Sequence, residues 1–139
     1  MADDALTVLV YSDDRNTRDQ VRLALGRRPA SDLPPVNFVD AATDWAVLDR
    51  LGRGDVDLAI LDGEAVPAGG LGVCRTIKQE VFQSPPILLL IARPQDRWLA
   101  TWSRADGVVS HPLDPIATAA AAAQLLRARV AAGDIAARS

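Results

Sequence analysis

Two patterns of apolar and polar residues alternate along the chain. Short runs of consecutive apolar residues recur, and each is followed by a longer stretch whose apolar residues lie three or four positions apart. The first pattern is typical of a strand buried on both faces, and the second of a helix with one buried side. Such runs predict strands at residues 6–11, 58–61, 87–91 and 107–110, and the alternating residues 36–39 suit a strand towards the edge of the sheet.

Five helices are predicted between and after these strands. Their ranges are 15–28, 45–51, 71–82, 95–105 and 115 to about 131. Asn16 or Thr17, Thr43 or Asp44, and Asp114 are candidate caps, because their side chains can accept a hydrogen bond from a first-turn N–H group. The alternation predicts a doubly wound α/β domain with a parallel sheet. We expect one domain over residues 1–132 and a C-terminal tail over 133–139.

The totals exclude several classes of protein. With 139 residues, 49% of them hydrophobic and 24% charged, the chain is long enough for one domain with a real core. Its net charge of −3 shows no basic footprint, so no nucleic-acid partner is predicted. The acidic start lacks the basic segment of a signal peptide, and the longest apolar run, residues 87–92, is too short to cross a bilayer. We expect a cytoplasmic protein without direct membrane insertion.

The chain offers few groups for catalysis. It has one cysteine, Cys74, and one histidine, His111, which cannot by themselves build a metal site or a nucleophilic triad. Cys74 cannot form an internal disulfide and is expected to pack in the interior. No enzyme activity is predicted.

One carboxylate stands out by its position. Asp62 directly follows the apolar run of residues 58–61 and precedes Gly63. The carboxyl ends of parallel strands form the edge at which α/β proteins bind ligands. Asp13 follows the first strand and is expected at the same edge. Asp62 is therefore the first candidate for a functional residue.

Four segments together resemble a response-regulator receiver domain. They are VLVYSDDRNTR (8–18), VDLAILDGEAVPAGGLGVCRTIK (56–78), PPILLLIA (85–92) and ADGVVSHPLDP (105–115). The resemblance runs from about Leu6 to Val130, and Gly70 lies eight residues after Asp62, where the family has a glycine between loop and helix. It implies a flavodoxin-like fold of five βα units with strand order 2-1-3-4-5.

The resemblance also implies a chemistry. In this family an acidic pair after the first strand and the aspartate ending the third strand hold Mg²⁺, and that aspartate accepts a phosphoryl group from a histidine kinase. A Ser or Thr ending the fourth strand and a Lys ending the fifth then respond to the added charge. Asp62 matches the acceptor, and Asp13 matches one of the acids. The resemblance thus implies at most weak Mg²⁺ binding at Asp13 and Asp62, and no other cofactor.

The chain departs from the family at most of the other site positions. The second acid position falls on a serine, the proline of the following loop comes one residue late, and three switch positions carry unusual residues. These positions are Ser12, Pro67, Ile91, Val108 and His111. Isoleucine cannot hydrogen-bond a phosphoryl oxygen, histidine is a shorter and weaker donor than lysine, and fewer carboxylates bind Mg²⁺ less well. We predict a degenerate site that does not switch by phosphorylation.

Two roles stay open for each central residue. Asp62 is either a phosphoacceptor or a remnant carboxylate that accepts hydrogen bonds from nearby backbone N–H groups. His111 is either a phosphate contact or pH-sensitive partner of Asp62, or it forms a hydrogen bond with Asp62 that replaces the family's Lys–Asp pair. In each case the second role is the one we expect.

A pair of tryptophans predicts a surface for a partner. Trp98 and Trp102 are four positions apart and lie on one helical face, outside the inward positions near Leu99 and Ala100. Tryptophan is enriched among interface anchors, and Arg97 lies beside the pair. We expect Trp98, Trp102 and Arg97 to bind a protein partner; the alternative is that the tryptophans pack over neighbouring loops. Trp45, on an earlier helix, is expected in the core.

These observations predict a stand-alone, receiver-like interaction module whose binding does not depend on phosphorylation. The Ala- and Arg-rich composition resembles that of actinobacterial proteins. Stand-alone receiver-like proteins of that lineage include accessory subunits of the respiratory NADH dehydrogenase. By this resemblance the chain is expected to be an accessory subunit at the cytoplasmic side of such a membrane complex. The alternative is a single-domain response regulator phosphorylated on Asp62 by a histidine kinase.

Overall fold

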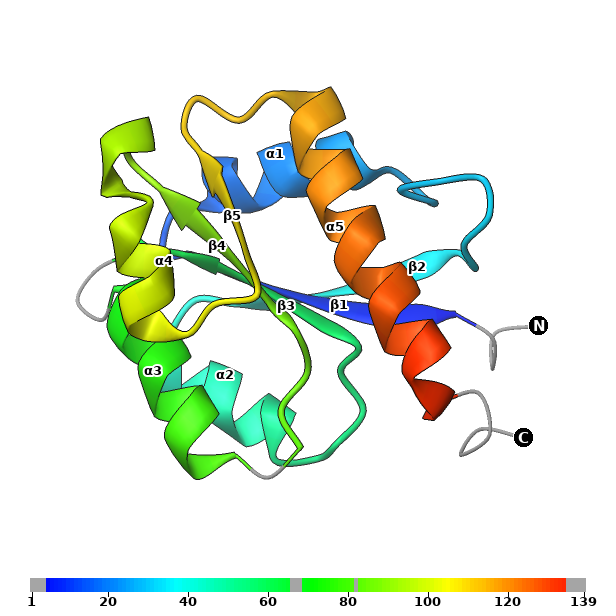
Figure 1. Cartoon of the computed structure of the whole chain (residues 1–139), viewed down its shortest axis with the longest axis horizontal. Coiled ribbons are helices and arrows are strands. Elements are labelled where there is room, and N and C mark those ends of the chain that lie inside the picture. Colours follow the sequence, from blue (N-terminus) through cyan, green and yellow to red (C-terminus); the bar gives the residue numbers. More distant parts are fainter. Residues whose placement is uncertain (1–4, 66–68, 82, 135–139) are drawn as a thin grey trace.

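A five-stranded parallel sheet forms the centre of the protein and is covered by helices on both faces (Figure 1). The computed structural model describes residues 5–65, 69–81 and 83–134. The strands are β1 (Leu6–Tyr11), β2 (Val36–Ala41), β3 (Leu58–Asp62), β4 (Ile87–Ile91) and β5 (Gly107–Ser110). The α-helices are α1 (Arg15–Leu25), α2 (Asp44–Leu51), α3 (Gly70–Glu80), α4 (Trp98–Ser103) and α5 (Pro115–Arg129). A 3₁₀ turn, η2 (Pro94–Asp96), precedes α4, and a π-helical turn, η3 (Val130–Asp134), follows α5.

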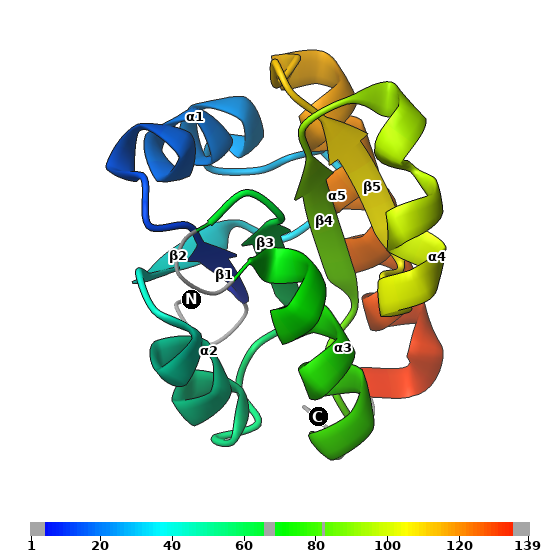
Figure 2. The ribbon, with the colours of Figure 1, turned by 90° about the vertical axis from the view of Figure 1, so that its left-hand side faces the viewer.

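The strand order is β2-β1-β3-β4-β5, with every neighbouring pair parallel. Helices α1 and α5 pack on one face, and α2, α3 and α4 on the other (Figures 1 and 2). The predicted fold class and strand order are therefore confirmed. No helix in the described part of the chain is long and apolar enough to span a bilayer.

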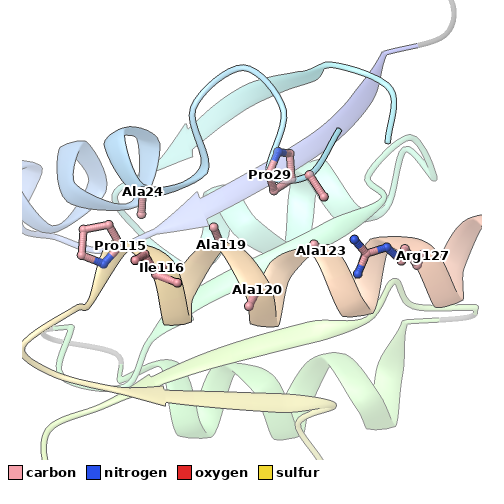
Figure 3. Close-up of a pocket in the computed structure, with 9 residues that line it drawn as sticks. Ala24, Pro29, Pro115, Ile116, Ala119, Ala120, Ala123 and Arg127 are labelled. Carbon is pink, nitrogen blue, oxygen red and sulfur yellow. The ribbon is translucent and has the colours of Figure 1, made fainter. Parts of the chain in front are cut away.

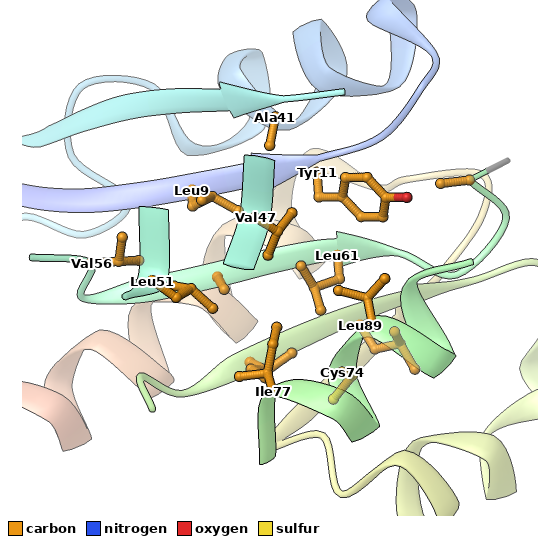
Figure 4. Close-up of a cluster of buried hydrophobic side chains, with 14 of the residues drawn as sticks. Leu9, Tyr11, Ala41, Val47, Leu51, Val56, Leu61, Cys74, Ile77 and Leu89 are labelled. Atoms are coloured by element: carbon orange, nitrogen blue, oxygen red, sulfur yellow. The ribbon is translucent and has the colours of Figure 1, made fainter. Parts of the chain in front are cut away.

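The apolar runs are continuous because both faces of the sheet are covered. Every residue of β3 and β4 is buried. Side chains alternate between the faces along each strand. Leu9, Tyr11, Leu61 and Leu89 point towards α2 and α3 (Figure 4), while their neighbours Val10 and Ile60 are among those that pack beneath α1 and α5. Cys74 is buried between the sheet and α3, and its Sγ donates to the Ser103 carbonyl at 3.3 Å. Burial raises the pKa of this thiol.

Element boundaries differ from the predicted ones where a local contact decides them. Helix α1 begins one residue before the predicted caps, because Asp14 accepts a hydrogen bond from the Asn16 N–H at 2.9 Å; the prediction of Asn16 or Thr17 was wrong. Thr43 and Asp114 cap α2 and α5 as expected. The predicted helix over 95–105 is divided into η2 and α4. Phe82 and residues 135–139 lie outside the described residues, so the predicted tail stays a prediction.

Trp45 is not in the core, and this prediction was wrong. Its side chain is 72% exposed on the first turn of α2. The buried stripe of this short helix is formed by Val47 and Leu51, which are four positions apart. A residue two positions before Val47 is rotated by about 200° around the helix and therefore points away from the sheet.

A shallow groove lies between α1, the loop that follows it, and α5 (Figure 3). Small side chains of α5, including Ala119, Ala120 and Ala123, form its floor. An ion pair between Arg127 and Asp32, with Nε and Oδ2 2.7 Å apart, lies at its far end. The alanine-rich stretch of α5 thus leaves room beside α1.

Candidate functional site

A hollow opens at the carboxyl edge of the sheet, where β1, β3, β4 and β5 end. Its lining residues come from all four strand ends and from the start of α1, and they are Asp13, Asp14, Thr17, Asp62, Glu64, Ala92 and His111. Asp62 is the last residue of β3, and His111 comes directly after β5. The structure therefore brings together Asp13, Asp62 and His111, which are far apart in the sequence. This follows from the parallel arrangement, which places the ends of all strands at one edge.

The carboxylate of Asp62 is held by two donors of the same chain. Its Oδ2 accepts from the Ser12 hydroxyl at 2.7 Å, and its Oδ1 accepts from the Glu64 N–H at 2.9 Å. Asp62 is 4% exposed and Ser12 is fully buried. The Ser12 hydroxyl in turn accepts from the Asp14 N–H at 3.0 Å. A neutral hydroxyl thus occupies the position at which the resemblance implies a second acid, and it bonds directly to the acceptor position.

His111 does not form the expected hydrogen bond. Its Nε2 lies 3.8 Å from Asp62 Oδ1, beyond hydrogen-bond distance, so the prediction of a His–Asp hydrogen bond was wrong. Both oxygens of Asp62 already accept bonds from Ser12 and Glu64. At this distance a charge–charge attraction between the two groups requires a protonated imidazole. The peptide bond between His111 and Pro112 is cis.

The donors around Asp62 do not match the acidic site that the resemblance implies. Asp14 is engaged as the cap of α1, where it accepts from the Asn16 N–H and, at 3.4 Å, from the Thr17 hydroxyl. Ser12 brings no charge. Within the described ranges no three His, Cys, Asp or Glu side chains are grouped closely enough to hold a metal ion. Weak binding of Mg²⁺ by Asp13 and Asp62 therefore stays a prediction.

Apolar side chains occupy two of the positions at which the resemblance implies a response to an added phosphoryl group. Ile91 is buried in the core layer beneath α3 and α4, and Ala92 is the residue of this strand end that lines the hollow. Neither carries a hydroxyl group. Val108 is half-buried and packs against the same layer as Ile91. Pro67, predicted to alter the loop over the site, lies outside the described residues.

The sequence patterns did not predict that three further residues lie at this edge, and they indicated Thr17 only as a helix cap. Glu64 and Thr17 line the hollow, and Tyr11 lies next to Ser12 at the end of β1. Burial raises the pKa of the Tyr11 phenol, and the nearby charges of Asp44, Asp13 and Asp62 raise it further. Tyr11 had the pattern of a strand residue only; its place beside three carboxylates depends on which strands are neighbours.

Two glycines set the position of Asp62. A Cβ atom on Gly70 would lie 2.6 Å from the Asp62 carbonyl oxygen, and one on Gly63 would lie 2.7 Å from the Leu90 carbonyl oxygen. Both distances are far below normal contact, and in each case the obstacle is backbone. The start of α3 therefore packs directly against the end of β3 only because no side chain intervenes.

Gly70→Ala is expected to destabilise the protein by about 2–3 kcal/mol, because the backbone of α3 or of β3 must shift. Gly72→Ala, in the same helix, is the matched control: no atom lies within 4 Å of its added Cβ, so higher helix propensity should stabilise by up to about 1 kcal/mol. Urea unfolding of both variants measures the two effects. Equal effects of the two substitutions would contradict the steric argument.

The predicted partner-binding residues lie on the outside of α4. Trp98 is 64% exposed and Trp102 48% exposed, while Ala100 faces the core. The guanidinium carbon of Arg75, on α3, lies 4.5 Å from the centre of the Trp102 ring. Arg97 is exposed directly before the helix. The tryptophans therefore lie at the surface, as the helical spacing predicted.

A doubly wound sheet in this order, with an aspartate ending β3 in a hollow at the carboxyl edge, is the arrangement found in response-regulator receiver domains. Solved structures with this fold include the signal receiver domain of an HD domain-containing protein from Pseudomonas fluorescens Pf-5, with a TM-score of 0.77, 19% identity, and coverage of 94% of this chain and 93% of that one. Another is the Vibrio cholerae chemotaxis protein CheY4, with a TM-score of 0.67, 20% identity, and coverage of 88% and 98%.

Sequence comparison shows the family. Uncharacterized response regulatory proteins from two Mycobacterium tuberculosis strains, CDC 1551 / Oshkosh and H37Rv, are each 51% identical over 124 residues, covering 89% of this chain and 93% of the relative. No protein-family model matches the chain. The chain belongs to the response-regulator receiver family.

Proposed function

We propose that this receiver domain is a protein-interaction module that docks on its partner through α4 and does not depend on phosphorylation of Asp62. The observation that carries the proposal is the exposed pair Trp98 and Trp102, four positions apart on one helix. Large indole groups exposed together on a rigid helix are the usual anchors of a protein interface. The role is a binding role and involves no catalytic chemistry.

Independence from phosphorylation has its own support. Both oxygens of Asp62 are engaged, one of them by the buried hydroxyl of Ser12. The end of β4 carries Ile91 and Ala92, whose side chains have no group that can donate a hydrogen bond to a phosphoryl oxygen. Without a side-chain contact from the end of β4, phosphorylation of Asp62 would not change the preferred position of the segment that leads from β4 into α4.

We further propose that the partner belongs to a larger assembly and that the chain is an accessory subunit, as in the respiratory NADH dehydrogenase, on the cytoplasmic side of the membrane. The support is the resemblance to actinobacterial receiver-like proteins. The mycobacterial source of the 51% identical relatives agrees with that lineage.

The second candidate is a working response regulator that accepts a phosphoryl group on Asp62. One observation favours it: the Asp62 carboxylate lies at the open hollow, with Asp13 and His111 among the lining residues. Intact mass after incubation with acetyl phosphate and Mg²⁺ separates the two candidates. We expect no phosphoryl-sized gain; a gain that is absent from Asp62→Asn would establish the second candidate.

Asp62→Asn is expected to leave partner capture unchanged. The tagged protein and this variant are expressed in cells of the source organism, and the captured proteins are quantified by mass spectrometry. Asparagine keeps an acceptor for the Ser12 hydroxyl but cannot be phosphorylated, so a module that is independent of phosphorylation should retain its partner within about twofold. A loss of more than tenfold would instead support phosphorylation-dependent docking.

A further inference from the structure

The surface formed by Arg75, Arg97, Trp98, Trp102 and Arg104 joins α3 and α4, and we call it the α3–α4 surface. Resting on the proposed function, we infer that its partner is an acidic protein segment. Carboxylates of that segment pair with the three arginines, and its apolar side chains cover the two tryptophans. The two helices lie side by side on the same face of the sheet (Figure 2). Helix α4 has six residues and is therefore about 9 Å long, so Arg97 and Arg104, which flank it, are separated by little more than this length.

The arginines of this surface carry surplus positive charge. Neighbouring cations are paired: Lys78 Nζ lies 2.7 Å from Asp106 Oδ2, and an Arg93 nitrogen lies 3.3 Å from Asp96 Oδ1. Arg75, Arg97 and Arg104 lie within ion-pair distance of no carboxylate among the described residues. This surplus stands in a chain whose net charge is −3, so the overall composition does not explain it. Three uncompensated arginines beside two indole rings are complementary to an acidic partner with apolar side chains.

Arg75 is arranged to receive a carboxylate. Its guanidinium carbon lies over the Trp102 ring, 4.5 Å from the ring centre, and this contact restricts the movement of the guanidinium. The N–H donors lie in the plane of the guanidinium, at its edges, and a carboxylate binds there in a two-point contact. A stacked arginine has already lost part of its conformational freedom, so pairing with a carboxylate costs less entropy. The stacking thus favours a carboxylate ligand at the rim of the tryptophan pair.

A protein segment fits this surface better than a polyanion does. Long-range attraction of nucleic acid or of an anionic membrane depends on the charge of the whole molecule, and this chain has a net charge of −3 and a pI of about 5.0. The positive charge is local and is interleaved with indole rings. Such a pattern selects its partner through short-range contacts to both charged and apolar groups. A peptide with acidic and apolar side chains can form both kinds of contact.

The experiment is a selection of random 16-residue peptides, displayed on messenger RNA, against the immobilised full-length chain. Peptides retained by Trp98→Ala/Trp102→Ala are removed in each round. We expect the recovered peptides to be enriched in Asp and Glu together with Leu, Ile and Phe. For the tightest synthetic peptide, Arg75→Ala and Arg97→Ala should each raise Kd by about fivefold or more. Arg27→Ala, an exposed arginine beyond α1, is the matched control and should change Kd by less than about twofold.

Each outcome decides between the two ideas. Peptides that depend on the tryptophans but are neutral or basic, or that bind the arginine variants unchanged, overturn the acidic-partner inference and leave the proposed function standing. If a selection without this removal step yields peptides that bind the natural chain and the double variant equally well, the proposed docking surface itself is overturned. Vesicles of phosphatidylglycerol and phosphatidylcholine and a single-stranded oligonucleotide are measured in parallel. Tighter binding of either than of the best peptide would also overturn the inference.

Discussion

The double variant Trp98→Ala/Trp102→Ala is expected to weaken partner capture by at least about 100-fold while its melting temperature stays within about 3 °C of that of the natural chain. A tryptophan at the centre of an interface contributes about 2 kcal/mol or more, and two of them correspond to roughly 1,000-fold in Kd before losses from non-additivity. The side chains are 64% and 48% exposed, so their removal leaves no cavity in the core. Only the Arg75 stack on Trp102 is lost within the domain, at about 0.5–1 kcal/mol.

Trp45→Ala is the matched control for this experiment. Trp45 is also exposed, at 72%, but it lies on α2, away from α4 (Figure 2). Capture by this variant should equal that of the natural chain. Quantified capture together with thermal unfolding monitored by circular dichroism gives both values for each variant. If Trp45→Ala weakens capture as much as the double variant does, general surface apolarity rather than the α3–α4 surface explains the binding.

The second large effect is expected from Ser12→Asp. Ser12 is fully buried and its Oγ lies 2.7 Å from Asp62 Oδ2, so an aspartate at this position places two carboxylates side by side in a poorly hydrated site. Like charges at such a distance repel strongly, and we expect a loss of about 3 kcal/mol without divalent cations. For a chain of this length the loss corresponds to a fall in melting temperature of roughly 10 °C.

Mg²⁺ should reverse most of this loss. The substitution supplies the carboxylate that the resemblance implies, beside Asp62 and near Asp13, and hard oxygen ligands of this kind bind Mg²⁺. Because the cation binds only the folded state, 10 mM Mg²⁺ should raise the melting temperature of Ser12→Asp by several degrees. Ser12→Asn, which adds similar bulk without charge, should show a smaller loss and no response to Mg²⁺. An equal Mg²⁺ response of Ser12→Asp and Ser12→Asn would show that charge at position 12 does not decide metal binding.

Much of the fold could be predicted because burial leaves a direct mark on the sequence. Strands β3 and β4 are covered on both faces, so they appear as uninterrupted apolar runs. The caps Thr43 and Asp114 act through hydrogen bonds to residues three positions away, which makes them local as well. Such features depend on neighbours in the chain and are therefore visible without the structure.

Predictions that depended on contacts across the sheet were less accurate. His111 follows β5 and Asp62 ends β3, and the distance between their side chains depends on strand register and on which donors already occupy the carboxylate. Trp45 is a large apolar residue of the kind expected in a core. The rotation of α2 about its own axis, however, is set by Val47 and Leu51, which pack on the sheet. The spacing of residues along the chain determines neither the distance between His111 and Asp62 nor the rotation of α2.

The sequence by itself determined the alternation of strands and helices, the place of Asp62 at a strand end, and the common face of Trp98 and Trp102, because each follows from the period of a strand or a helix. Only the tertiary structure decided that the Ser12 hydroxyl bonds to Asp62 and that Arg75 stacks on Trp102. Those contacts join residues that are 50 and 27 positions apart. They form because packing of the helices on the twisted sheet fixes relative positions that no local pattern encodes.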